Sequence, residues 1–213
     1  MSFHSYVAGL NIRITDGQAL NCLGWVAEKE GGRRIEPSPA LKTKAQILTS
    51  AHGLGFLASA AAFLLSLPLN HFVMPEWLAK YKLPPLYSPL ACTVLRIAAS
   101  AGSVAISLTS ASATKHLGSQ WNYFGLRERP KVVKTGPYSI VRHPMYSCGI
   151  VLEVCFAGMF WNWMPLAVLG AVLIPAFVIK IPMEEKAILE SKIGAEYKEY
   201  QKIVRWRLCP YLW

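Results

Sequence analysis

The chain has 213 residues, of which 53% are hydrophobic and 16% are charged, and its formal net charge is +10. Because soluble domains carry about 25% charged residues, this composition argues against an ordinary soluble domain. The positive charge does not indicate a nucleic-acid partner, because no basic stripe interleaved with aromatic residues is present and anionic lipid headgroups explain the charge better.

The five cysteines form no CxxC pair and are odd in number, so neither a disulfide framework nor a metal site is expected. Cys209 is followed by four residues, whereas a prenylation motif has three. The N-terminus lacks a basic start followed by a long apolar run, so no cleaved signal peptide is predicted.

Residues 1–46 are polar and show no convincing periodicity. We expect this region to be poorly ordered or to lie along a membrane surface. The remainder, residues 47–213, is expected to form a single membrane domain, since little polar sequence is left to build a second one.

Four apolar segments in this domain predict an all-α, polytopic membrane helical bundle. Segment 47–69 contains no Lys, Arg, Asp or Glu over 23 residues, and segment 88–113 is interrupted only by Arg96. At 1.5 Å per residue, both can cross a hydrocarbon core of about 30 Å. Segments 145–160 and 164–179 have 16 residues each and are separated by a Trp-Asn-Trp turn, which predicts a short helical hairpin.

We expect Pro175 to kink the last of these helices. Short, kinked helices often form the walls of a cavity, although a locally thinned membrane would also accommodate them.

The distribution of Lys and Arg predicts the orientation of the bundle. The N-terminal region has six, residues 114–144 have six and residues 180–213 have seven, whereas the 70–87 connector has two and the hairpin turn has none. By the positive-inside rule, both termini and the 114–144 segment face the cytosol. The polar groups able to do chemistry are expected there as well, in a cytosolic cofactor pocket.

The stretch from Thr135 to Tyr146, TGPYSIVRHPMY, is the most informative motif. A Gly-Pro turn precedes an Arg-His pair, and Pro144 begins or bends the third membrane helix. Arg142, His143 and Tyr146 would therefore line any cavity that opens at the membrane boundary. The plainer interpretation is a polar and aromatic interfacial anchor.

A second polar cluster contains Lys180, Glu184 and Glu185, at the predicted end of the fourth helix. Since the hairpin returns to the same side, these residues should approach Arg142 and His143. Lys180 and Glu184 have the i,i+4 spacing of one helix face. A Lys/Glu helix end is also common on a solvated surface.

Taken in order, TGPYSIVRHPMY, the short hairpin, the K-I-x-x-E-E cluster and G-x-E-Y-x-x-Y near Gly194 resemble the isoprenylcysteine carboxyl methyltransferases and their phospholipid methyltransferase relatives. The resemblance covers roughly residues 121–207. It implies a multi-pass protein of the endoplasmic reticulum membrane that methyl-esterifies the prenylated C-terminal cysteine of CaaX-processed proteins, with S-adenosyl-L-methionine as cofactor.

The resemblance also implies roles for individual residues. Lys180, at the position of the substrate-facing arginine, would serve catalysis and contact the substrate. The residues themselves add Arg142, beside His143 in the motif, as a second catalytic candidate, and Arg96, a charge inside a membrane segment, as a second substrate contact. Either Glu184 or Glu185 would bind the cofactor, because the spacing from the pair to Gly194 is one residue longer than usual. The other implied cofactor-binding residues are Val132, Val133, Tyr138, His143 and Tyr146.

Two positions depart from the family pattern. Pro130 stands where a histidine is often found, and Lys180 stands where the family has a substrate-facing arginine. Lysine keeps the charge but loses the two-pronged geometry that suits a carboxylate. Two charges inside membrane segments, Arg96 and Glu153, are expected to form an ion pair, or Arg96 faces a substrate tunnel; otherwise Arg96 extends to the interface.

Three functions are compatible with these residues. The main hypothesis is a prenylcysteine carboxyl methyltransferase, since its carboxylate acceptor needs no general base at pH 7. An amino-lipid N-methyltransferase of the phosphatidylethanolamine type would need a base, and a non-catalytic membrane scaffold of the same fold is the third. The expected partners are a prenylated protein C-terminus and membrane lipids, and no nucleic acid; the sequence does not indicate the oligomeric state.

Overall fold

The computed structural model describes residues 28–213 except 36, 87, 123 and 212, so the first 27 residues of the 1–46 region lie outside the described part. The described part is helical and has no β-strands, which confirms the predicted all-α class. The helices are α2 (Pro39–Leu64), α3 (Ser66–Leu69), α4 (Glu76–Ala79), α5 (Pro89–Leu117), α6 (Pro144–Phe160), α7 (Met164–Val168), α8 (Ile174–Leu189) and α9 (Gly194–Ile203).

Three continuous helical stretches in the described residues are long and apolar enough to cross a membrane: Pro39–Leu69, Pro89–Gln120 and Met164–Leu189. A shorter apolar helix, Pro144–Phe160, completes the four predicted segments. Large apolar side chains on α2 and α5 face outward; Leu54 is 66% exposed and Leu90 is 72% exposed. Such continuous apolar surface is expected to contact lipid.

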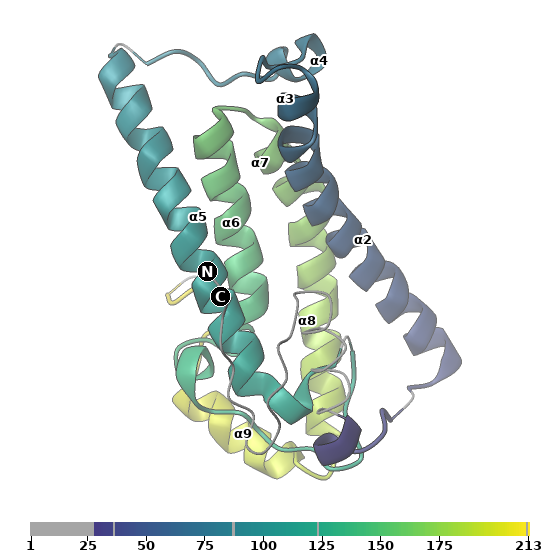
Figure 1. The fold of residues 1–213 in the computed structure, drawn as a ribbon. Coiled ribbons are helices and arrows are strands. Elements are labelled where there is room, and N and C mark those ends of the chain that lie inside the picture. The colour runs from purple at the N-terminus through teal and green to yellow at the C-terminus, as the bar shows by residue number, and fades with distance from the viewer. Residues whose placement is uncertain (1–27, 36, 87, 123, 212) are drawn as a thin grey trace, which may run out of the picture.

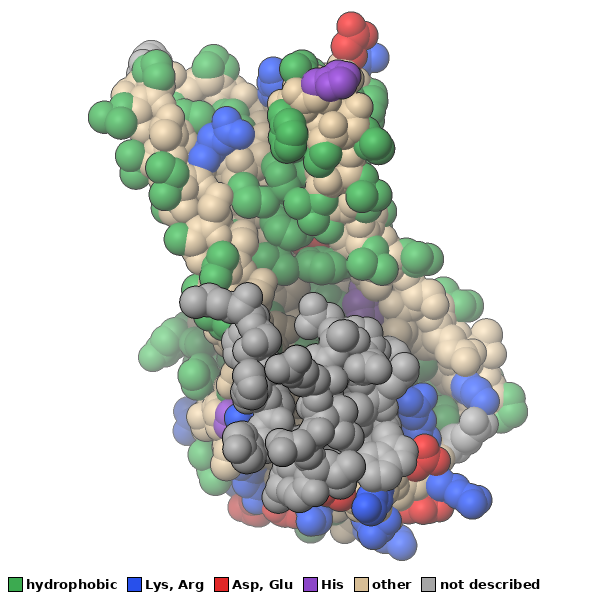
Figure 2. All heavy atoms as spheres, in the orientation of Figure 1, with side chains coloured by type: hydrophobic (Ala, Val, Ile, Leu, Met, Phe, Trp, Pro, Cys, Tyr) green, Lys and Arg blue, Asp and Glu red, His purple; other side chains and the backbone are tan. Residues whose placement is uncertain are grey.

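The long helices lie side by side, with α5 packed on α6 and α2 crossing α8 (Figure 1). The short helices α3, α4 and α7 gather at one end of the bundle, and α9 lies at the other (Figure 1). Charged side chains cluster on the visible face around the α9 end and are sparse over the middle of the bundle (Figure 2). The chain is therefore a multi-pass membrane protein with a polar base at its α9 end.

Proline begins three of the four long helices. Pro39, Pro89 and Pro144 each occupy the first turn of α2, α5 and α6, where an amide N–H would have no helical acceptor. Ser88 precedes α5 and its hydroxyl accepts a hydrogen bond from the Ala91 amide. These local signals explain why the predicted starts of α5 and α6 are accurate to one residue.

The hairpin turn between α6 and α7 is held by a buried amide side chain. Trp161 ends α6 in a left-handed conformation with φ of 54°. The Asn162 side chain donates to the Leu78 carbonyl at 2.8 Å and accepts from the Met164 amide at 2.9 Å. The turn therefore closes against the 70–87 connector, which the sequence left unplaced.

The fourth membrane segment is longer than predicted. Helical structure runs from Met164 to Leu189, ten residues beyond the expected end at 179. A π-helical turn, Leu169–Leu173, lies immediately before the Ile174-Pro175 step, where proline supplies no amide donor. The prediction ended the helix at the first charges, but Lys180 and Glu185 are buried and paired, so the helix continues through them.

The predicted ion pair between Arg96 and Glu153 is not formed. Glu153 is fully buried between α6 and α2, where its carboxylate accepts a 2.8 Å hydrogen bond from the Ser59 hydroxyl. Arg96 instead donates through Nε to the Met159 carbonyl at 2.9 Å. The two charges thus find separate partners, because α6 directs Glu153 toward α2 and not toward α5.

The described part of the N-terminal region is held against the loop after α5. The Ile35 amide donates to the Leu126 carbonyl, and Arg129 donates its amide to the Gly31 carbonyl. The Arg127 side chain is 2% exposed and donates to the Gly32 carbonyl at 3.0 Å. A Cβ at Gly31 would overlap the Ser119 carbonyl, so this approach requires glycine.

Candidate functional site

The C-terminal segment fixes the backbone of the Arg-His pair. The amides of Arg142 and His143 donate to the carbonyls of Trp206 and Arg207, each at 2.9 Å. The Ser147 hydroxyl, one turn into α6, donates to the Leu208 carbonyl at 2.6 Å. Residues more than 60 positions away in the chain therefore set the direction of the two motif side chains.

A glycine turn brings Tyr138 into the interior. Gly136 has φ of 59°, and a Cβ there would overlap the His116 ring, so both conformation and space require glycine. Tyr138 is buried, and its carbonyl accepts a 2.6 Å hydrogen bond from the Tyr200 hydroxyl of α9. Burial raises the pKa of Tyr200 to about 12 and also raises the pKa of Tyr138, so both phenols stay neutral near pH 7.

Glu185 forms the centre of a buried ionic cluster. Its carboxylate accepts from Arg142 Nε at 2.7 Å and from Arg207 Nε at 2.9 Å. His143 Nε2 lies 3.3 Å from the same carboxylate. Arg142 also donates through Nη1 to the Val204 and Arg205 carbonyls. This cluster ties α8, the start of α6 and the C-terminal segment together, and Glu185 does not line the cavity described next.

A cavity of about 470 Å³ opens beside this cluster and is lined in part by Tyr197 and Tyr200 of α9. Pockets that bury small ligands usually have about 300–1,000 Å³. Its lining residues come from α2, the loop after α5, the start of α6, α8 and α9; those that carry polar side chains are Thr49, His52, Gln120, Trp121, Asn122, Arg127, Lys131, Tyr138, Arg142, His143, Tyr146, Lys180, Glu184, Tyr197 and Tyr200.

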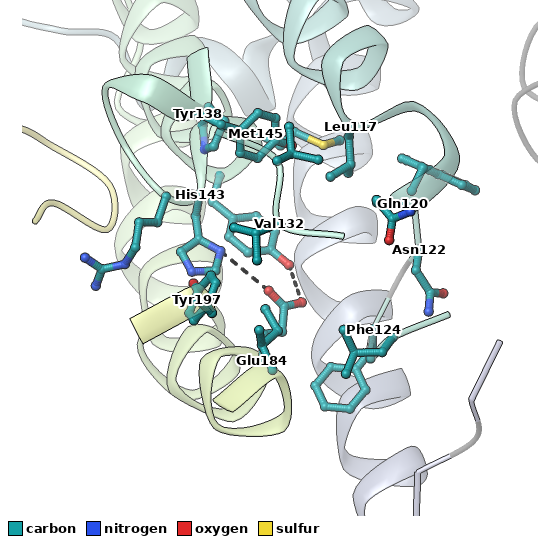
Figure 3. A pocket seen from close by; sticks show the side chains of 18 of the residues that line it. Leu117, Gln120, Asn122, Phe124, Val132, Tyr138, His143, Met145, Glu184 and Tyr197 are labelled. Atoms are coloured by element: carbon teal, nitrogen blue, oxygen red, sulfur yellow. Dashed lines mark hydrogen bonds and ion pairs between the residues drawn. The ribbon is translucent and has the colours of Figure 1, made fainter. Parts of the chain in front are cut away.

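Glu184 is the carboxylate that faces this cavity. The Tyr146 hydroxyl donates to it at 2.7 Å, and His143 Nδ1 lies 3.7 Å from its other oxygen. Figure 3 shows Glu184 and His143 pointing toward each other, with Val132 beside them and Phe124 and Leu117 on other walls. A held carboxylate next to apolar and aromatic walls is suited to a ligand with a cationic group and a flat ring.

Lys180 contributes a buried ammonium to the cavity lining. Its side chain is 2% exposed, its ammonium lies 3.7 Å from Glu184 and 5.3 Å from the centre of the Tyr146 ring. The Tyr146 ring stacks on Phe177 at 4.7 Å between centroids. A buried ammonium with one carboxylate partner keeps N–H donors for a second anion in the cavity.

His52 of α2 meets the Tyr146 ring in an edge-to-face contact, with ring centroids 5.8 Å apart. Its Nδ1 is 2.9 Å from the Leu48 carbonyl, which can only accept, so Nδ1 carries the proton of this hydrogen bond. In the neutral ring, Nε2 is then a lone-pair acceptor. His52 is not among the site residues predicted from the sequence, although His52 and Thr49 form an i,i+3 polar pair within an apolar segment.

The structure brings most of the predicted site residues together. The cavity is lined by Val132, Val133, Tyr138, Arg142, His143, Tyr146, Lys180 and Glu184. Glu185 does not line the cavity, and Arg142 donates through Nε to Glu185 and through Nη1 to backbone carbonyls. Arg96 lies outside the cavity, near the opposite end of α6. The roles assigned to all these residues remain predictions.

The amides Gln120 and Asn122 were missed. They lie on the loop after α5, and both point along one wall of the cavity (Figure 3). Gln120 is held there because its side-chain oxygen accepts from the Lys131 amide at 3.0 Å. No local signal marks these residues, since polar residues are ordinary in loops.

Residues 99–190 match the model of the isoprenylcysteine carboxyl methyltransferase (ICMT) family. A search of curated proteins gives no match. The matched region contains α6, α8 and the loop with the Gly-Pro turn, and thus Tyr138, His143, Tyr146 and Glu184. It ends before α9 and does not include α2, so the walls carrying Tyr197 and His52 lie outside the match.

Proposed function

We propose that this protein methylates the C-terminal carboxylate of a prenylated cysteine. The proposal starts from the match of residues 99–190 to the isoprenylcysteine carboxyl methyltransferase family model. The family match supports a membrane methyltransferase of the isoprenylcysteine type. The observation that carries the finer proposal is the juxtaposition of Glu184 and Lys180, a held carboxylate and a buried ammonium, on one side of a cavity beside membrane helices.

The donor set of the cavity fits S-adenosylmethionine. Glu184 would hold its ammonium, His143 and the amides Gln120 and Asn122 offer hydrogen bonds, and Val132 and the other apolar walls suit an adenine ring. When bound, this cofactor supplies an electrophilic methyl group on a sulfonium. The absence of a glycine-rich dinucleotide loop agrees with a site built between membrane helices.

The chain's own residues would mainly hold and orient the reactants. A carboxylate acceptor with a pKa near 3.5 is already ionised at pH 7, so no proton must be removed. Lys180 would pair with that carboxylate, and the apolar walls would exclude water. Positioning of two reactants can contribute about 7–11 kcal/mol toward a barrier, so a site without a strong base is sufficient.

His52 favours a second candidate, an amino-lipid N-methyltransferase. An amine must lose a proton to become a nucleophile, and His52 Nε2 is a neutral acceptor in the cavity wall. Lys180 opposes this candidate, because its charge repels an ammonium that enters the same cavity. We retain the carboxylate as the preferred acceptor on this ground.

The two candidates can be separated with the purified full-length protein in nanodiscs and S-adenosylmethionine labelled in its methyl group. N-Acetyl-S-farnesylcysteine and phosphatidylethanolamine are offered in parallel. We expect label in the first, and Lys180→Met should lower that activity by about tenfold or more, since it removes a charge-assisted contact. Lys186→Met, which removes an exposed lysine from the same helix, is the control.

His52→Gln sharpens the comparison. It should leave carboxyl methylation nearly unchanged but reduce amine methylation by about 100-fold or more, the usual contribution of a general base. Label in phosphatidylethanolamine alone would overturn the preferred acceptor. Absence of label in both, together with absence of cofactor binding by calorimetry, would support a scaffold.

The cellular location, the orientation in the membrane and the protein partner are also proposals. Residence in the endoplasmic reticulum, an orientation with both termini in the cytosol and a prenylated protein C-terminus as partner follow from the family and from the charge distribution. The cavity then opens toward the cytosol, where prenylated proteins are made.

A further inference from the structure

A second hollow of about 420 Å³ lies at the opposite end of the bundle from the cavity of Glu184. It is lined by Leu67, Phe72, Met74, Lys82, Arg96, Phe160 and Trp161. Met159, which accepts from Arg96, is 13 residues along α6 from Tyr146, so the two sites are about 20 Å apart by helical rise. Nothing proposed for the methyl-transfer site uses these residues.

The Arg96 guanidinium is only partly satisfied by the described protein. Nε donates to the Met159 carbonyl, one of the last carbonyls of α6 and therefore without a helical donor. This contact directs the guanidinium across the end of α6 into the hollow. Within the described residues, no hydrogen bond or ion pair engages its two terminal nitrogens, which leaves four N–H donors for a ligand.

Charge in this hollow is of one sign. Arg96 and Lys82 are its two charged lining residues, and no Asp or Glu of the described chain lines it. A guanidinium at a membrane boundary without a counter-ion is costly, and its planar donors match the oxygens of a phosphate. Arg96 and Lys82 together carry more positive charge than one phosphodiester neutralises. A zwitterionic headgroup would add its own ammonium to this site, so a net-anionic headgroup is favoured.

The surroundings suit the rest of a lipid. Trp161 and Phe72 are among the lining residues, and aromatic side chains of this kind are enriched at the headgroup level of a bilayer. Exposed apolar side chains continue from the hollow along the membrane faces of α3 and α5; Leu69 is 83% exposed and Ile97 is 63% exposed. A phosphate held by Arg96 and Lys82 would place acyl chains along these faces.

We propose that the hollow between α3, α5 and the α6–α7 turn binds the phosphate of a net-anionic membrane phospholipid through Arg96 and Lys82. The ligand would join the 70–87 connector to the ends of α5 and α6. Its source is the bilayer and not free phosphate, because the hollow opens onto apolar helix faces.

The test is native mass spectrometry of the full-length protein in detergent, with dioleoylphosphatidylglycerol and dioleoylphosphatidylcholine as separate probes. We expect the anionic lipid to bind about fivefold more tightly or better, and Lys82→Met and Arg96→Met each to weaken it about fivefold, since each removes one cation near the headgroup. Lys80→Met, an exposed lysine of the same connector that does not line the hollow, is the matched control.

Three results would overturn the proposal: equal binding of the two lipids, binding unchanged in Lys82→Met, or displacement of the anionic lipid by millimolar inorganic phosphate. The last result would assign the hollow to a free anion. Because Lys82 is exposed, its variant should fold even if Arg96→Met does not, and unchanged melting of Lys82→Met in detergent verifies this.

Discussion

Neighbouring glutamates on α8 occupy different environments. Glu184 faces the cavity and is held by the Tyr146 hydroxyl, whereas Glu185 is enclosed by Arg142, Arg207 and His143. Successive residues of an α-helix point about 100° apart, so the two carboxylates face different surroundings. We propose ligand binding for Glu184 and structural support for Glu185.

The substitutions Glu184→Gln and Glu185→Gln should therefore separate binding from stability. Glu184→Gln should weaken S-adenosylmethionine binding by about 10- to 100-fold, the value of a hydrogen bond to a charged group, while Gln keeps an oxygen for Tyr146. Glu185→Gln should lower the free energy of unfolding by about 3–5 kcal/mol, because the buried Arg142 guanidinium and the partly exposed Arg207 guanidinium lose their carboxylate.

Calorimetry in nanodiscs measures the first effect, and thermal unfolding followed by a thiol-reactive dye measures the second. Glu190→Gln, at the exposed end of the same helix, should alter neither quantity. Cofactor binding that survives in Glu184→Gln but is lost in a stably folded Glu185→Gln protein would reverse the assignment.

At the scale of elements, α2 and α6 are joined by a polar contact inside the bundle. The Ser59 hydroxyl is the one donor that reaches the buried Glu153 carboxyl among the described residues, and the other Glu153 oxygen has no partner there. If this donor is removed, the buried carboxyl loses its hydrogen bond, and the free energy of its desolvation is no longer offset.

Ser59→Ala should therefore lower the free energy of unfolding by about 1–3 kcal/mol. Ser107→Ala provides the control, since the Ser107 hydroxyl is exposed and bonds only to its own helix. The measurement is the midpoint of thermal unfolding in nanodiscs. If both variants melt alike, the contact does not hold α2 against α6.

At the scale of the whole molecule, the cavity and the second hollow lie at opposite ends of a bundle that spans the membrane. Their charged linings differ as well, since one carboxylate, Glu184, lines the cavity together with several cations, whereas Lys82 and Arg96 are the charged residues that line the hollow. The excess of Lys and Arg in the segments near the α9 end predicts that this end faces the cytosol.

The predicted orientation can be checked by cysteine labelling in sealed microsomes. In a cysteine-free background, Lys198→Cys on α9 should react with a membrane-impermeant maleimide, and Lys80→Cys in the connector should react only after permeabilisation. Both positions are exposed, so access is limited by the membrane alone. Labelling of Lys80→Cys in sealed vesicles would invert the orientation.

Much of the molecule could be predicted from sequence because the signals are local. Long stretches without charge select membrane helices whatever their neighbours, and proline at 89 and 144 marks helix starts. The return of the hairpin, which brings Lys180 and Glu184 to His143, follows from segment order alone. The motif residues were therefore expected at one end, and the structure places His143, Lys180 and Glu184 in the lining of one cavity.

Tertiary packing decided the rest. Which glutamate faces the cavity depends on the rotation of α8, and Glu185 is held by Arg142 and by Arg207 near the far end of the chain. His52 joined the site only because α2 crosses α8, and Arg96 parted from Glu153 because α6 turns that carboxylate toward Ser59. Sequence alone determined membrane embedding, through local hydropathy; the direction of each side chain, and the presence of His52, Gln120 and Asn122 in the cavity lining, were settled by contacts between segments distant in sequence.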